Sequence, residues 1–433
     1  MKKILFAIMA MATLTACNKD DDDPQPEVKA ARTVLIYISG ECSLWDYVQI
    51  DLDEIKAGSM SIGDNNLLVY VDRGYTKEIP WLARVKNGQF VDSVSIKNIV
   101  DEMNLTPAKT TVADDPYASE GQVMEGVLRY AFKKYPSKND DYALGLWGHG
   151  SGWLIRDSVA YTAMARKAYG IDNGKNSDDD SGKWLNIPTM AKVLSKLPHL
   201  TYIFCDCCNM MCLENAYELR NVTDYIMGSP AEIPGEGAPY DKVVPAMFEK
   251  GTSNNIPSFA KSIIDYYYEQ RASGYDEPLS VIRTSEMENL ASATRSVLKA
   301  IAPKLPNPGD GYPDMTGLIH YYYDYGYERE FYDANDFILK YAEPADYNNW
   351  KQALDKAVIY KKMAENWMID KNSIKATYWV QWDKYYGSYF TVTEEKYGGV
   401  SMFVPQYLQR TSNNIYIQRM GWYYAAGYYE IGW

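Results

Sequence analysis

The sequence predicts an α/β fold with a doubly wound, mostly parallel sheet flanked by helices. Short, nearly continuous apolar runs rich in β-branched residues recur between residues 33 and 229, as expected of strands buried on both faces of a parallel sheet. Segments with helical apolar spacing separate these runs, and this alternation is typical of sheets covered by helices. From about residue 255 the pattern becomes helical and rich in tyrosine, which predicts a helix-rich C-terminal extension.

A strand, helix, strand unit opens the folded sequence. Strands are expected at 33–39 (TVLIYIS) and 66–72 (NLLVYVD). Between them, apolar residues recur at helical spacing up to Gly58, a typical helix stop signal. A second helix is expected over 119–136, with Ser119 as its capping residue.

The remaining elements follow in the same alternation. Residues 141–153 (DYALGLWGHGSGW) predict a buried strand that runs into a glycine-rich turn. After it we expect a helix at 188–198, a strand at 200–206, a helix at 210–222 and a strand at 223–229. In the C-terminal extension, helices are expected at 258–270, 287–302 and 350–367, and strand-like segments at 388–394 and 398–405.

The first residues, MKKILFAIMAMATLTAC, predict an export signal. Two lysines precede an apolar run at 4–12, which is too short to cross a bilayer core of about 30 Å. The ending at 14–17 resembles a bacterial lipobox, in which Cys17 is lipidated and becomes the first mature residue. The protein is then anchored to the membrane by lipid chains. An ordinary signal peptide with a chance cysteine is the alternative.

The chain is expected to divide into four parts. A signal peptide at 1–16 is followed by the lipidated cysteine and an acidic tether at 17–31, a core at 32–254, and a region at 255–433 that completes the fold. The tether is charged, contains proline and lacks aromatic residues, so it cannot form a core. Its acidic run resembles surface-export tags of some Gram-negative lipoproteins, although a plain spacer is equally compatible. We expect an outer membrane lipoprotein, at the periplasmic face or the cell surface.

The formal net charge of −13 comes from 57 acidic against 44 basic residues. Nucleic acid phosphates would be repelled by such a surface, so nucleic acid is not an expected partner. Cationic partners or substrates suit this negative charge better than nucleic acid does.

Two predicted strands end in reactive residues. His149 follows the strand at 141–147, and a cysteine cluster follows the strand at 200–206. Ligands of open α/β sheets bind beyond the carboxyl ends of strands, where these residues would meet. Cys208 lies at the predicted strand-to-helix turn, where unpaired N–H groups lower a thiol pKa. Its own N–H and that of Gly150 would hold an oxyanion. Without the cysteine cluster at a neighbouring strand end, His149 would be interpreted as a structural histidine.

The cluster contains Cys205, Cys207, Cys208 and Cys212. A zinc site is a minor alternative, because structural zinc sites usually pair separated knuckles and adjacent cysteines are hard to direct at one ion. Disulfides fit an exported protein better, although a bond within a buried strand and turn would be strained. Most of these thiols are expected to be small buried hydrophobes; the roles of Cys205, Cys207 and Cys212 stay open.

The run LGLWGHGSGW, followed by IFCDCCNM and later by AYELRNVTDYIMGSPAEIPGEG, resembles the clostripain family of cysteine peptidases, a caspase-like clan. The resemblance extends over nearly the whole mature chain. It implies a caspase-like catalytic core and an endopeptidase that cleaves after Arg or Lys. By position it makes His149 the catalytic histidine, Cys208 the nucleophile, and Asp206 a carboxylate in the pocket for the basic side chain. Glu236 would be a second pocket carboxylate or a solvated loop residue.

The chain also departs from the family pattern. Where the family commonly has Asp-Ala-Cys-Leu-Met, residues 206–210 read Asp-Cys-Cys-Asn-Met, so a second thiol adjoins the proposed nucleophile. Relatives are often matured by self-cleavage, for which Arg166, Lys167 and Lys175 are candidates. We expect no cofactor; the alternative is calcium at the aspartates 178–180, although such a run is more often a solvated turn. The alternative function is a catalytically silent surface lipoprotein that binds glycan or protein.

Overall fold

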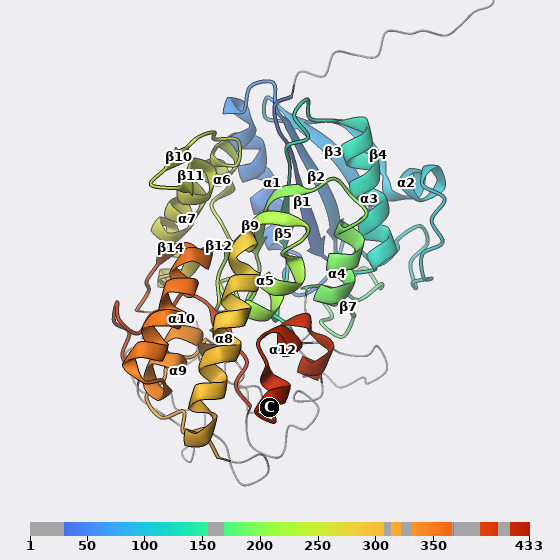
Figure 1. Cartoon of the computed structure of the whole chain (residues 1–433). Coiled ribbons are helices and arrows are strands. Elements are labelled where there is room, and N and C mark those ends of the chain that lie inside the picture. Colours follow the sequence, from blue (N-terminus) through green and yellow to red (C-terminus); the bar gives the residue numbers. More distant parts are fainter. Residues whose placement is uncertain are drawn as a thin grey trace, which may run out of the picture.

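A nine-stranded mixed sheet runs through the computed structural model (Figure 1). The structure describes residues 30–154, 169–306, 313–321, 331–365, 367, 390–405 and 416–433. The five central strands are parallel: β1 (Thr33–Gly40), β2 (Asn66–Arg73), β5 (Tyr142–Trp147), β8 (Leu200–Asp206) and β9 (Thr223–Gly228). The mostly parallel α/β sheet predicted from the sequence is therefore confirmed.

Antiparallel strands extend both edges of this sheet. At one edge, β3 (Trp81–Lys86) and β4 (Gln89–Ser95) form a hairpin beside β2. At the other edge, β12 (Leu279–Arg283) pairs with β9, and β14 (Val358–Lys362) pairs with β12. The strand order is β14-β12-β9-β8-β5-β1-β2-β3-β4. The C-terminal region thus contributes two strands to the sheet as well as helices.

Helices cover both faces of the sheet (Figure 1). On one face lie α1 (Tyr47–Gly58), α6 (Tyr240–Ala246) and α7 (Ser258–Gln270). On the other lie α3 (Gly121–Lys134), α4 (Ile187–Leu194) and α5 (Leu213–Leu219), with α2 (Ile96–Glu102) beside α3. The C-terminal helices α8 (Met287–Ile301), α9 (Ala334–Tyr341), α10 (Pro344–Ala357) and α12 (Gly421–Ala425) join this second layer.

Side chains of strand β1 pack alternately into the two hydrophobic cores on either face of the sheet. All eight of its residues are buried. Leu35 and Tyr37 pack in the core under α3, α4 and α5, whereas Val34, Ile36 and Ile38 pack in the core under α1, α6 and α7. Successive side chains of a strand point to opposite faces, so a continuous apolar run is required when both faces are covered.

Several predicted element ends differ from the structure. Helix α3 begins at Gly121 after Glu120, and Ser119 gives no capping hydrogen bond. The predicted helix 350–367 ends at Ala357, where the β-branched VIY segment leaves the helix to pair with β12 as β14. Tertiary pairing here overrides a helical spacing that continues in the sequence.

The two strand-like segments predicted near the C-terminus are mostly irregular. Described residues 390–394 of the first form no strand. The second contains only the two-residue strand β15 (Ser401–Met402), which pairs with β13 (Tyr332–Asp333). Among the described helices, none combines the length and apolarity needed to span a bilayer.

Candidate active site

Three loops meet where the parallel strands β1, β5 and β8 end. Ile38 of β1 pairs with Trp147 of β5, which in turn pairs with Asp206 of β8, so the three strands end at one level. The turn after β5 packs directly on the turn after β8. A Cβ atom placed on Gly150 would lie 2.4 Å from the carbonyl oxygen of Cys208, so only glycine fits there.

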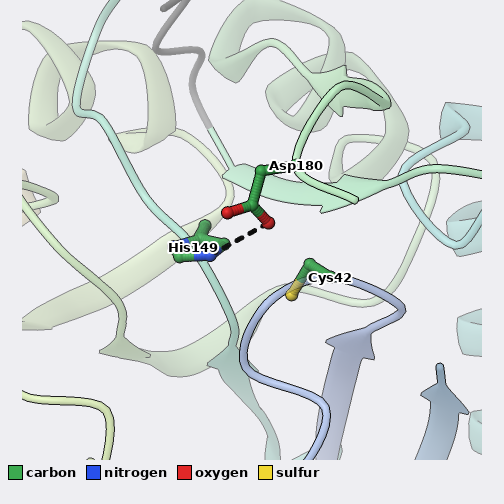
Figure 2. A group of neighbouring side chains, drawn as sticks. All are labelled: Cys42, His149 and Asp180. Atoms are coloured by element: carbon green, nitrogen blue, oxygen red, sulfur yellow. Dashed lines mark ion pairs between the residues drawn. The ribbon is translucent and has the colours of Figure 1, made fainter. Parts of the chain in front are cut away.

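His149 lies at this edge with two partners on Nε2. The Oγ atom of Ser43 is 3.0 Å away and Oδ1 of Asp180 is 3.5 Å away, as Figure 2 shows for the Asp180 pair. Ser43 comes from the loop after β1, and its N–H donates to Asp180 Oδ1 at 2.9 Å. Asp180 therefore joins the loop after β1 to the imidazole.

The charge on His149 follows from these partners. Burial by itself would lower the pKa of His149, but the interactions with Asp180 and Cys42 outweigh it and raise that pKa to about 10. Burial likewise opposes ionisation of Asp180, yet its contact with His149 leaves the pKa of Asp180 below the usual range. At neutral pH the pair is therefore an imidazolium facing a carboxylate, and the imidazole is equipped to donate a proton.

Exposure separates the clustered cysteines. Cys208 is partly exposed, whereas Cys205, Cys207 and Cys212 are buried in the core. Burial raises the pKa of Cys207 and of Cys212 well above the usual range, which favours the unreactive thiol. The five described cysteines are all free, so the disulfide alternative has no support among them.

Cys208 lies at the end of β8 as predicted, but not at a helix N-terminus. Helix α5 begins at Leu213, with Cys212 at its N-cap position, later than the expected start at residue 210. Activation of the thiol by this helix is therefore wrong as an explanation. Instead, the Cys208 sulfur contacts the backbone of Ile233: the Ile233 N–H donates to the sulfur at 3.4 Å, and the thiol donates to the Ile233 carbonyl oxygen at 3.9 Å.

Asp206 lies beside the cysteine but is only 3% exposed. It accepts hydrogen bonds from the Ala238 N–H (3.1 Å) and from the hydroxyls of Tyr240 (2.9 Å) and Tyr267 (2.7 Å). Glu236 lies in the same loop as Ala238 and accepts a hydrogen bond from Ser273. The loop covers Asp206 closely, because a Cβ on Gly237 would lie 2.7 Å from Asp206 Oδ2.

A third carboxyl group, Glu277, was not anticipated from the sequence. It is fully buried, and neither carboxyl oxygen has a hydrogen-bond partner among the described residues. Burial, and then the nearby charges of Asp206, Asp276 and Glu236, raise the pKa of Glu277 well above its usual range. Its position depends on the pairing of β12 with β9, which the sequence did not reveal. A cation entering beside Asp206 would find here a buried carboxyl group without a partner.

The family model of the clostripain family matches residues 36–428. The chain belongs to the clostripain family. It is a cysteine protease, and a prokaryotic membrane lipoprotein lipid attachment site matches residues 1–18. The comparison with curated proteins gave no match.

Solved clostripain-family structures confirm the fold. A secreted C11 cysteine protease from Bacteroides thetaiotaomicron, in complex with an irreversible peptide inhibitor, has 29% identity and a TM-score of 0.67, covering 92% of this chain and 99% of that chain. An inactive zymogen C11 protease from Parabacteroides distasonis has 27% identity and a TM-score of 0.67, covering 92% and 98%. Another secreted enzyme from B. thetaiotaomicron, called iotapain, has 18% identity and a TM-score of 0.65, which supports the fold alone.

Some predicted functional residues of this clostripain-family chain lie outside the described residues. These are Cys17, Arg166 and Lys167. Lys175 is described and lies in a tight loop, where its N–H donates to Glu41 Oε1 at 2.7 Å and its Nζ pairs with Asp179 at 2.8 Å. Self-cleavage at these sites stays a prediction.

The aspartates considered for calcium have separate partners. Asp178 accepts a hydrogen bond from the Tyr75 hydroxyl (2.8 Å), Asp179 pairs with Lys175, and Asp180 pairs with His149. These three carboxylates are not among the described groups in which one oxygen from each member lies within 4.8 Å of all the others. The run does not provide one joint set of ligands.

A different acidic group fits a hard cation better. Glu41, Asp72 and Asp115 are buried, and one carboxyl oxygen from each lies within 4.8 Å of the others. Among the described residues, Oδ2 of Asp72 has no hydrogen-bond partner, and no Lys or Arg forms an ion pair with any of the three. Burial raises the pKa of each of them. Calcium binds oxygens at about 2.3–2.6 Å, so ligands up to about 5 Å apart can share one ion.

Replacing Asp180 with Asn keeps its shape and removes its charge. We expect the pKa of His149 to fall from about 10, because the interactions with Asp180 that oppose the effect of burial are lost and only those with Cys42 remain. NMR titration of the imidazole resonances measures this directly, since the chain has three histidines and His149→Gln identifies the relevant one.

Asp178→Asn is the matched control, because Asp178 contacts Tyr75 and not the imidazole. The pKa of His149 is higher in the folded protein than in the unfolded chain. The ion pair with Asp180 therefore stabilises the fold fully below about pH 6.5, and this stabilisation is lost as pH rises through about 10. We therefore expect Asp180→Asn to lower the unfolding temperature more at pH 6 than at pH 10. An unchanged His149 pKa in Asp180→Asn would contradict this account.

Proposed function

We propose that this protein is a membrane-anchored cysteine endopeptidase that cleaves after Arg or Lys, with Cys208 as nucleophile and His149 as proton donor. The observation that carries the proposal is that the turn bearing the partly exposed Cys208 packs on the turn bearing His149 and Gly150. Membership of the clostripain family and the lipid attachment match support the reaction class and the anchor. Lipid chains on Cys17 would hold the enzyme on the outer membrane, at its periplasmic face or at the cell surface.

The proposed reaction uses each group for one task. The Cys208 sulfur attacks the scissile carbonyl, and the N–H groups of Cys208 and Gly150 stabilise the oxyanion. His149, held as an imidazolium by Asp180, protonates the leaving amine. The Cys208 thiol gives its proton to solvent on attack. Water then hydrolyses the thioester, which releases the carboxylic acid and the Cys208 thiol, and solvent returns a proton to His149. His149 need not contact the sulfur in the resting state for these steps to follow.

Preference for a basic side chain is supported by the buried carboxyl groups beyond the cysteine. Asp206 already accepts three hydrogen bonds, so it offers little further capacity. Glu277 offers two oxygens that have no hydrogen-bond partner among the described residues, and a Lys or Arg side chain would counter the rise of its pKa and favour a paired carboxylate. We infer that Glu277 provides the negative charge that selects basic substrates. Asp206 would support the pocket, and Glu236 would lie in the loop that covers Asp206.

We also propose that Glu41, Asp72 and Asp115 hold Ca²⁺. The ion would neutralise buried carboxylates that have no described cation nearby. It would also fix two loops that serve the site, because Glu41 adjoins Cys42 and Ser43 and accepts N–H groups from Lys175 and Asn176. The role of the ion would be structural, since its ligands are separate from the proposed dyad.

The first test is hydrolysis of reporter peptides ending in Arg, Lys, Asp, Asn or Leu. We expect turnover after Arg or Lys, loss of turnover to background in Cys208→Ala, and retained turnover in Cys207→Ala, because Cys207 is buried. Absence of all turnover, also after incubation that permits self-cleavage, would favour the silent surface lipoprotein. Turnover lost only in Cys207→Ala would move the nucleophile by one residue.

Glu277→Gln tests the origin of specificity. We expect kcat/KM for Arg and Lys peptides to fall by about tenfold to a hundredfold, as expected for a charge-assisted hydrogen bond of about 1.5–3 kcal/mol. Thermal unfolding should change little, because Gln matches the shape of the Glu277 side chain and breaks no hydrogen bond of its carboxyl group to the described residues. Glu269→Gln, on exposed helix surface, is the control. Equal kcat/KM values in the two variants would make Glu277 a structural residue.

Calcium binding is measured without reference to activity. We expect Ca²⁺ to raise the unfolding temperature of the full chain and EGTA to reverse the change. Asp72→Asn should abolish this response, whereas the exposed Asp178→Asn should keep it. If the carboxyl groups instead share protons without an ion, wild type and Asp72→Asn would both be insensitive to Ca²⁺, and the proposed site would be wrong.

A further inference from the structure

A second group of ligand-type side chains lies against His149. It consists of Cys42, from the loop after β1, with His149 and Asp180 (Figure 2). One donor atom from each lies within 4.8 Å of the other two. The cysteine in this group is not the proposed nucleophile: the Cys208 sulfur contacts the backbone of Ile233.

The donor types are those of a zinc site. Thiolate, imidazole and carboxylate bind Zn²⁺ at about 2.3, 2.0–2.1 and 2.0–2.2 Å, usually in a tetrahedron. Such a tetrahedron places its nitrogen and oxygen ligands roughly 3.3 Å apart, and His149 Nε2 and Asp180 Oδ1 are already 3.5 Å apart. The other such group among the described residues contains only carboxylates, which suit harder ions.

The group is also arranged to admit an ion from one side. The Cys42 side chain is fully buried, so the surrounding loop holds its sulfur in place. The side chains of His149 and Asp180 are 26% and 47% exposed, respectively. The fourth ligand of a tetrahedral ion would be a water molecule or the hydroxyl of Ser43, which lies 3.0 Å from His149 Nε2.

We propose that Cys42, His149 and Asp180 form an inhibitory site for Zn²⁺. Binding releases two protons to solvent, one from the Cys42 thiol and one from the His149 imidazolium, and no group is oxidised or reduced. The ion then carries a thiolate, a neutral imidazole and a carboxylate, whose two negative charges balance its own. His149 can no longer donate its proton to a leaving amine. Inhibition, unlike metal binding, rests on the proposed catalytic role of His149.

Metal binding is tested first in the Cys208→Ala protein, in which the rival thiol is absent. Added Co²⁺ should give the charge-transfer absorption of a thiolate-bound ion, at one ion per chain, and Zn²⁺ should displace it. The absorption should disappear in Cys208→Ala/Cys42→Ala and persist in Cys208→Ala/Cys207→Ala, which removes another buried thiol. Absorption that persists without Cys42, or that is absent in Cys208→Ala, would overturn the site.

Inhibition is then measured on proteins that retain Cys208, each relative to its own zinc-free rate. We expect Zn²⁺ to inhibit wild type reversibly, with a chelator restoring activity, and Cys42→Ala to need at least about tenfold more Zn²⁺, the change expected from loss of about 1.4 kcal/mol of binding. Equal sensitivity of the two proteins would place the inhibitory ion on Cys208 and overturn the proposal. A wild type without peptidase activity would contradict the proposed function, while the Co²⁺ absorption would still decide the metal site.

Discussion

The common end level of the parallel strands β1, β5 and β8 is the constraint on which the site depends. Hydrogen bonding between parallel strands fixes their register, and the pairs from Ile38 to Trp147 and from Trp147 to Asp206 bring three loops to one edge. The loop after β1 carries Cys42 and Ser43, the loop after β5 carries His149 and Gly150, and the loop after β8 carries Cys208. The close contact of Gly150 with Cys208 shows how little space separates the last two. A change of register in any of these strands would move its loop out of reach of the others.

The second organising factor is an excess of buried carboxyl groups around this edge. Burying an ionised carboxylate without a partner costs several kcal/mol, so each group must be paired, protonated or bound to a cation. Asp180 is paired with the imidazolium of His149, whereas the pKa of Glu277 is raised well above its usual range by burial and neighbouring charges. The trio with Asp72 has no described ion pair. The net charge of −13 thus has a local counterpart in these buried carboxyl groups.

The sequence predicted the parts of this structure that rest on local pattern. Continuous apolar runs identified the five central strands, and the strand ends identified His149 and Cys208. The hairpin of β3 and β4 escaped notice because β4 is largely exposed and has no continuous apolar run. Strand β14 falls within the predicted helix 350–367, because only its pairing with β12 distinguishes it from a helix. Asp180 and Glu277 were missed in their present settings because both depend on contacts between distant segments.

Adjacent thiols are distinguished by the alternation of the strand that precedes them. Along β8, Cys205 points into the core under α3 to α5, whereas Asp206 points to the opposite face and bonds Tyr240 and Tyr267 there. Cys207 returns to the first core, so its burial follows from the same alternation. Cys208 lies one residue further, where the chain has left the sheet and is partly exposed. An extra cysteine before the proposed nucleophile is therefore compatible with a single reactive thiol, because the strand's alternation buries Cys207 and leaves Cys208 partly exposed.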